Sequence, residues 1–152
     1  MGVIVGTELS PKLVDYLRGH RLVYVATVDE EGWPDLAPIS WVTALDAKKI
    51  RMAIDSNVGT VANVARTGRV RLSVLGGTMS VTIKGAARIV RERMESVAVP
   101  TSMIEVEVSE VKDDAFWGRA GDDGLALLWS QRRRVASDIA IMTELRGDAA
   151  PT

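Results

Sequence analysis

The fold is decided by the stretch LVYVATVDEEGWPDLAPISWVTALDAKKIRMAIDSNVGTVANVARTGRVRLSVLGGTMSVTIKGAARIV, which spans residues 22–90. Apolar and polar side chains alternate in short segments of this stretch, and a period of two is typical of β-strands. Residues that favour turns separate the segments, among them Asp29–Gly32 and the pair Gly76-Gly77. The alternation predicts strands at 22–28, 34–43, 50–55, 69–75 and 79–90.

A short helix at 58–67 interrupts these strands. Its apolar side chains recur at helical spacing on one face, and Gly68 is a suitable residue to end it. The predicted face consists of Val58, Val61, Val64 and Ala65. An earlier helix is predicted to begin at Pro11, with Ser10 as its N-cap, and to end at Gly19.

The remainder of the chain adds one strand and one helix. A strand at 103–111 is expected to point Ile104, Val106 and Val108 inward and Glu105, Glu107 and Ser109 outward. A polar connection at 91–101, with one or two helical turns at most, precedes this strand. The last helix is predicted from Gly124 to about 145, with an apolar stripe of Leu125, Leu128, Trp129, Val135, Ile139 and Met142. Together the elements predict a mainly antiparallel β-fold with flanking helices.

Two features of the first strands concern burial. The strand at 22–28 is mostly apolar on both faces, so we expect it to be covered on both sides. Pro38 cannot donate a hydrogen bond within a sheet and therefore marks either an edge strand or a bulge.

The composition is that of a globular protein and excludes several kinds of site. The 152 residues are 47% apolar and 26% charged with a net charge of −1, which predicts a single domain and no nucleic-acid partner. There is no cysteine and one histidine, so disulfides, thiolate chemistry and multi-histidine metal sites are excluded. We expect His20 to be a partly exposed residue at a helix end. No secretory signal and no apolar run of about 18 residues is visible, so no membrane contact and a cytoplasmic location are expected.

A candidate ligand site lies where the strand at 50–55 leads into the helix at 58–67. A helix N-terminus offers unpaired N–H groups and a positive dipole end, and phosphates bind there readily. Ser56, Asn57 and Thr60 add short polar side chains, and Gly59 allows close approach to the backbone. Taken alone, Ser and Asn before a helix are more often plain helix caps.

The segments VATVDEEGWPDLAPISW, KIRMAIDSNVGTVANVARTGRVRLSV and IKGAARIV, in this order, resemble the pyridoxamine 5'-phosphate oxidase-like family of FMN-binding split barrels. The resemblance covers about residues 10–112 and is similar in character to the small FMN-binding proteins of that family. It implies a split β-barrel with Greek-key antiparallel topology, a barrel core at about 20–112 and a C-terminal helix at about 124–146 outside the match. It also implies a homodimer that holds FMN at the interface.

The resemblance implies specific cofactor contacts. In the family, backbone groups of the second strand hold the edge of the isoalloxazine ring, the third strand contacts the ring and the ribityl chain, and the helix start binds the phosphate. The corresponding residues here are Pro38, Ile39 and Ser40 for the first group, Ala53, Ile54, Asp55 and Ser56 for the second, and Asn57, Gly59 and Thr60 for the third.

The sequence departs from the family pattern at two places. Many relatives have Lys or Arg at the helix start, where this chain has Gly59 and Thr60, so the phosphate would lack a charge-assisted contact. Residues that could compensate are Arg51, Arg69, Arg71 and Lys84, although each is expected to be a solvated surface charge. In addition, 115–145 lacks the Arg/His motif of true pyridoxamine phosphate oxidases, so that activity is not expected.

The predicted function is that of an FMN-binding flavoprotein that acts as an oxidoreductase. Its small-molecule substrate is unknown. The alternatives are a non-enzymatic FMN-binding electron carrier, a reductase that uses a deazaflavin coenzyme, and a barrel without cofactor. A deazaflavin has an anionic tail that the basic cluster Arg132–Arg134 could contact, although we expect this cluster to lie on a solvated helix surface. No catalytic side chain and no metal ligand is assigned.

Overall fold

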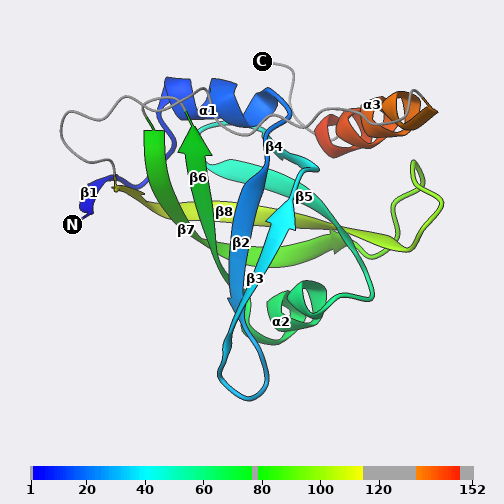
Figure 1. Ribbon diagram of the computed structural model, residues 1–152, viewed down its shortest axis with the longest axis horizontal. Coiled ribbons are helices and arrows are strands. Elements are labelled where there is room, and N and C mark those ends of the chain that lie inside the picture. The colour runs from blue at the N-terminus through cyan, green and yellow to red at the C-terminus, as the bar shows by residue number, and fades with distance from the viewer. Residues whose placement is uncertain (1, 77–78, 115–132, 148–152) are drawn as a thin grey trace.

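The computed structural model describes residues 2–76, 79–114 and 133–147, with the side chains of the last helix from residue 136 onward. Figure 1 shows a curled sheet with one helix at each end and a third helix against its side. The described elements are β1 (Val3–Gly6), α1 (Pro11–Arg18), β2 (Val23–Val28), β3 (Pro34–Ile39), β4 (Val42–Ala44), β5 (Lys49–Asp55), α2 (Gly59–Thr67), β6 (Arg69–Gly76), β7 (Met79–Arg91), β8 (Thr101–Asp113) and α3 (Arg133–Arg146). Within these ranges, no helix is long and apolar enough to cross a membrane.

The strands form one antiparallel sheet in the order β3-β2-β6-β7-β8-β5-β4, with β1 joined to β8. The two strands at the ends of this order, β3 and β4, are consecutive in the chain. The single strand predicted at 34–43 is therefore wrong, because the chain leaves one edge of the sheet at Ser40 and enters the other edge at Val42. The edge strands β3 and β4 are not paired with each other, and the gap between them makes the fold a split β-barrel, as predicted.

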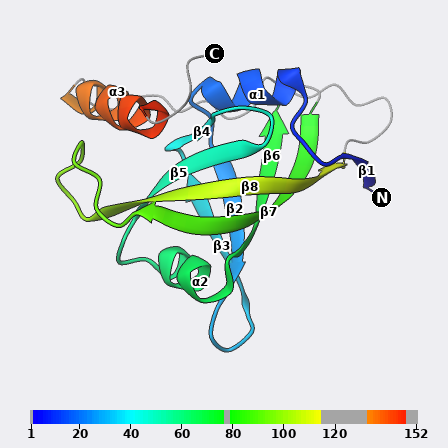
Figure 2. The same cartoon turned by 180° about the vertical axis from the view of Figure 1, so that it is seen from behind.

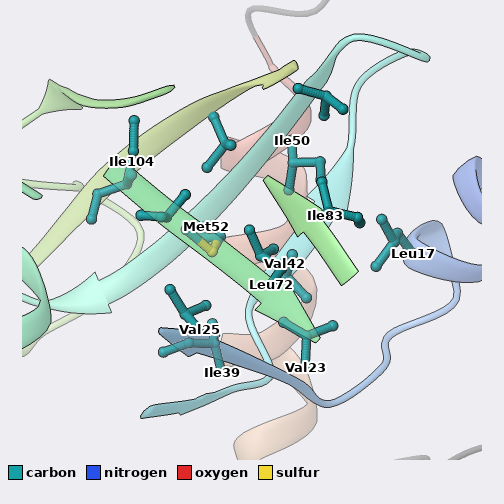
Figure 3. Packing of buried hydrophobic residues seen from close by; sticks show 14 of the residues in the cluster. Leu17, Val23, Val25, Ile39, Val42, Ile50, Met52, Leu72, Ile83 and Ile104 are labelled. Carbon is teal, nitrogen blue, oxygen red and sulfur yellow. The ribbon is translucent and has the colours of Figure 1, made fainter. Parts of the chain in front are cut away.

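The barrel interior is filled by the inward-facing side chains of the alternating strands. Figure 3 shows side chains from several strands converging on Met52 and Leu72, both fully buried. The alternation of β6 follows the prediction, since Val70, Leu72 and Val74 are buried while the residues between them are exposed. The connection at 92–100 contains no helix, so the helical turn considered there is absent.

The expectation that β2 is covered on both faces is wrong for the single chain. Val23, Val25 and Thr27 are buried, but Tyr24 and Val28 are 41% and 45% exposed. The β2–β3 register runs without a bulge, and β3 ends the strand order. Of the two alternatives for Pro38, the edge strand is therefore the one observed.

Helix α1 closes one end of the barrel (Figure 2). As predicted, the Ser10 side chain caps it by accepting a hydrogen bond from the Leu13 N–H, and Gly19 follows its last residue. Leu13 and Leu17 are buried in the barrel core. The Arg18 guanidinium donates to the carbonyl oxygens of Ala44 and Leu45 at 3.0 and 2.6 Å, which fixes the helix to β4.

Helix α2 lies at the opposite end, and its buried face differs from the prediction. Val61 and Val64 are buried as expected, but Val58 and Ala65 are exposed, and Thr60 and Asn63 are buried instead. The Asn63 side chain donates to the Thr27 hydroxyl at 3.0 Å and the Arg66 guanidinium donates to the Val28 carbonyl. The helix therefore turns Asn63 and Arg66 toward polar groups of β2. Hydrophobic periodicity alone does not predict this orientation.

Helix α3 packs on the outer face of β4 and β5 rather than on the barrel core. Its buried residues are Ile141, Met142 and Leu145, which contact Ala53, Met94 and Met103. Met142 was predicted to be part of the stripe, but Ile139 is 60% exposed, so that part of the prediction is wrong. The predicted helix start, the stripe residues Leu125, Leu128, Trp129 and Val135, and the side chains of Arg132–Arg134 lie outside the described residues.

Beneath α3 lies a buried ion cluster that contradicts the expectation of Arg51 as a solvated surface charge. Glu105 points away from the barrel interior as predicted, yet α3 covers it and it is only 6% exposed. Its carboxylate accepts hydrogen bonds from Arg51 at 2.9 and 3.0 Å and from Arg88 at 3.0 Å. Arg51 also donates to the Leu145 carbonyl of α3 at 3.3 Å. Arg51 is therefore a buried structural residue and not a solvated charge near the cofactor site.

The carboxylates that fasten α3 make stability dependent on pH. Burial by itself would raise the pKa of Glu105, but the hydrogen bonds and charges of Arg51 and Arg88 outweigh it and hold the pKa below its ordinary value of 4.5. The pKa of Glu144 is lowered in the same way, against its burial, by hydrogen bonds from Ser96, Glu95 and Arg91.

A group whose pKa is lower in the folded chain contributes stability above its unfolded pKa and loses that contribution as the pH falls through the folded value. We therefore expect the free energy of unfolding to decrease below about pH 4.5. Urea unfolding at a series of pH values measures this decrease. In the Glu105→Gln variant the slope on the acid side should be smaller, and an unchanged slope would contradict the assignment to Glu105.

Candidate functional site

The junction of β5 and α2 is built by a tight turn. The Asp55 side chain accepts a hydrogen bond from the Asn57 N–H at 2.9 Å, which turns the chain out of the strand. Asp55, Asn57, Val58 and Gly59 are exposed. The N-cap is Val58, without a side-chain hydrogen bond, so the expectation of a Ser or Asn cap is wrong. The first N–H groups of α2 thus remain available to a ligand.

Ser56 has a structural role in this turn. Its N–H donates to the Pro100 carbonyl at 2.9 Å, and its hydroxyl lies 2.7 Å from that of Ser102. These bonds connect the turn to the start of β8 and hold the helix N-terminus in a fixed direction. Thr60 is only 2% exposed as a whole residue, so its hydroxyl is not presented to a ligand in the single chain.

The residues predicted to contact the ring lie on both sides of the split in the barrel. Pro38 is exposed on the edge strand β3, Ile39 is buried in the core, and Ser40 follows the strand. The side chains of Ala53 and Ile54 on β5 are both 3% exposed, and Ala53 lies beneath α3. Ile39, Ala53 and Ile54 are therefore not exposed to a cofactor in the single chain.

The electrostatics around the start of α2 are acidic, and one contributor was missed from the sequence. A side chain at Gly59 would meet the Asp35 carboxylate, whose Oδ2 lies 3.5 Å from the Cβ position. The same oxygen accepts a hydrogen bond from Asn63 at 3.3 Å. Asp35 is remote in sequence, and only the β2–β3 hairpin brings it to the helix. With Asp55 it places two carboxylates near the proposed phosphate position.

The basic residues considered as compensation do not lie at this junction. Arg69, Arg71 and Lys84 line a groove that also includes Thr67 and Gly68, at the C-terminal end of α2. His20, as expected, follows a helix end, and its Nε2 lies 3.9 Å from the Asp138 carboxylate of α3. None of the basic residues considered above, as the structure describes them, contacts the first turn of α2.

The arrangement fits a flavin phosphate through its backbone and opposes it through its charges. An exposed helix N-terminus with a glycine at its first position can donate N–H groups to a phosphate. Two nearby carboxylates weaken the attraction for an anion. The backbone groups of Gly59 and Thr60 would hold the phosphate, and those of Pro38–Ser40 would hold the ring edge.

Comparison with known proteins agrees with the fold. A family model described as pyridoxamine 5'-phosphate oxidase matches residues 9–115. An uncharacterized protein of Bacillus subtilis, YclD, is 35% identical over 74 residues. That match covers 43% of this chain, and the chain spans about half (48%) of the length of that relative.

Among solved structures, an FMN-binding protein from Syntrophomonas wolfei superposes with a TM-score of 0.55 at 14% identity, covering 69% of this chain and 88% of its own. An F420 reductase superposes with a TM-score of 0.56 at 17% identity, covering 64% of this chain and 93% of its own. At these identities the structural likeness shows the fold alone. With its family model matched over most of the sequence, this split-barrel chain belongs to the pyridoxamine 5'-phosphate oxidase family.

Proposed function

We propose that this chain binds a flavin-type cofactor at the junction of β5 and α2 and acts as a cytoplasmic oxidoreductase other than pyridoxamine phosphate oxidase. The observation that carries the proposal is the exposed N-terminus of α2, which lies beside the split of the barrel and lacks a side-chain cap. The FMN-binding relative of the same fold supports it. A bound flavin would supply the hydride or electron chemistry.

The role of the protein in this proposal is to bind and orient. The N–H groups of Gly59 and Thr60 donate to the phosphate, and the edge of β3 from Pro38 to Ser40 offers backbone groups to the ring. Because Ser56 is fastened to β8, the helix N-terminus keeps its direction when the ligand arrives. No side chain is proposed as an acid or base.

The proposal includes a homodimer with the cofactor at its interface. The outer faces of β2 and β3 carry an uncovered apolar surface, which consists of Tyr24, Ala26, Val28, Pro34, Leu36 and Pro38. Leu36 is 62% exposed at its centre. Contiguous exposed apolar surface marks interaction sites. A second copy of the chain would cover the end of this face that carries Tyr24 and Pro38, where the strand pattern predicted burial.

The acidic surroundings of α2 favour a second candidate, a reductase that uses a deazaflavin. Asp35 and Asp55 disfavour the terminal phosphate of FMN, which carries more charge than a phosphodiester. The fold shared with an F420 reductase supports this candidate.

Titration of the purified chain with FMN and with a deazaflavin, followed by visible absorbance, tests cofactor binding. Size-exclusion chromatography of the same samples tests the dimer. We expect saturable binding of one of the two by a dimer. Oxidation of a reduced nicotinamide would then distinguish an enzyme from an electron carrier. A chain that binds neither compound would overturn the proposed function.

The Asp35→Asn variant tests the position of the phosphate. Removing this charge should tighten FMN binding by about three- to tenfold, because a carboxylate a few ångströms from a phosphate repels it even in a partly solvated site. The asparagine can still accept the hydrogen bond from Asn63. Affinity is measured by fluorescence quenching of the flavin.

Riboflavin, which has no phosphate, should bind the variant and the parent chain alike. Asp46→Asn is the matched control, because Asp46 lies in the β4–β5 turn and accepts N–H bonds from Lys48 and Lys49. Equal tightening by both variants would mean that net charge, and not Asp35, sets the affinity.

A further inference from the structure

A groove on the outer surface of the sheet has basic walls and an apolar floor. It has a volume of about 580 Å³ and lies over β2, β6 and β7, which run side by side (Figure 1). Ala26, Ala86 and Gly85 contribute small residues to its lining, and Val28 and Pro34 border it. Pockets of this size accommodate small organic ligands.

Three cations surround the groove without a described acidic partner. Arg69, Arg71 and Lys84 are exposed, and none of their side chains forms an ion pair within 4.0 Å with a carboxylate of the described ranges. By contrast, Arg51, Arg88 and Arg91 elsewhere on the same sheet all pair with glutamates.

The register places two of these cations directly opposite each other. Arg71 on β6 is the cross-strand partner of Lys84 on β7, and Ala26 on β2 is the next residue in the same row. Like charges at directly opposite positions repel each other and destabilise a sheet. A bound anion would relieve this repulsion.

Two acidic residues of β8 lie next to the groove cations in the sheet register. Glu110 is the register partner of Lys84, and Glu107 is the partner of Ala86, next to Arg69 in its row. Ser109 lines the groove at a β-bulge, with its hydroxyl donating to the Lys84 carbonyl at 3.1 Å. Neither glutamate forms an ion pair within 4.0 Å with the three cations among the described residues.

We propose that this groove binds a phosphate-bearing organic molecule, with Arg71 and Lys84 contacting the phosphate and Ala26, Val28 and Pro34 contacting an apolar part of the ligand. The site is separate from the N-terminus of α2, since it lies around the other end of that helix. The proposal is independent of flavin binding at the β5–α2 junction.

The test is titration of the full chain with inorganic pyrophosphate at low ionic strength, followed by calorimetry and by amide chemical shifts. Arg71→Gln and Lys84→Gln should each weaken binding by about tenfold, because each removes a charge-assisted contact. Lys48→Gln, which removes the same charge from the β4–β5 turn, should change it less than about twofold. The shifted amides should lie in β6 and β7.

Competition with FMN identifies the source of the phosphate. If FMN displaces pyrophosphate and Arg71→Gln weakens FMN but not riboflavin, the groove holds the cofactor phosphate. If the two bind simultaneously, the groove holds a different phosphorylated molecule. Binding that is absent, or that all three variants weaken equally, would overturn the proposal.

Discussion

Replacing Glu105 with alanine should lower the free energy of unfolding by about 3 kcal/mol, because it removes the carboxylate that accepts two hydrogen bonds from the buried Arg51 guanidinium. Arg51 is 8% exposed and holds two hydrogen bonds to this carboxylate. Arg51 also donates a hydrogen bond to the Leu145 carbonyl, which carries no net charge. For a chain of this length such a loss lowers the melting temperature by about 6–12 °C.

Thermal and urea unfolding measure the effect, and two variants serve as controls. Glu107→Ala removes an exposed glutamate from the same strand and should cost less than about 0.5 kcal/mol. The double replacement Arg51→Met with Glu105→Leu removes both charges and should recover most of the loss. If Glu105→Ala is as mild as Glu107→Ala, the ion cluster does not fasten α3 to the barrel.

Replacing Gly85 with alanine should destabilise the chain by about 2–3 kcal/mol, since the new methyl group has no space. The added Cβ would lie 2.5 Å from Cγ1 of Val106 and 2.6 Å from the carbonyl oxygen of Glu107. The second of these atoms belongs to the backbone of β8, so a side-chain rotation cannot relieve the contact. The strands β7 and β8 would have to separate at the bulge beside Gly85.

Gly59→Ala is the matched control for this prediction. There the added Cβ would meet only the Asp35 carboxylate, at an ordinary contact distance of 3.5 Å. Alanine also favours the helix that begins at this residue, so we expect stability to change by less than about 1 kcal/mol. A Gly85→Ala chain that unfolds at the same urea concentration as the parent would contradict the close packing of β7 on β8.

Much of the fold could be predicted because its signals are local. The two-residue alternation of β6 and β7, the Ser10 cap with Pro11, and the glycines that end α1 and α2 each act within a few residues. The junction of β5 and α2, where the candidate site is placed, was predictable for the same reason, since the two elements are adjacent in sequence. The acidic character of that site was not, because Asp35 reaches it only through the β2–β3 hairpin.

The sequence by itself determined most of the strand and helix segments and which sides of β6 and β8 face the barrel interior, but neither β1 nor the break between β3 and β4. Only the tertiary structure decided which outward-facing residues meet solvent. Glu105 and Ala53 point outward yet are buried beneath α3, while Tyr24 and Leu36 point outward and are exposed. Periodicity reports the two faces of an element, but burial depends on whether a segment distant in sequence covers the second face, and that depends on packing in three dimensions.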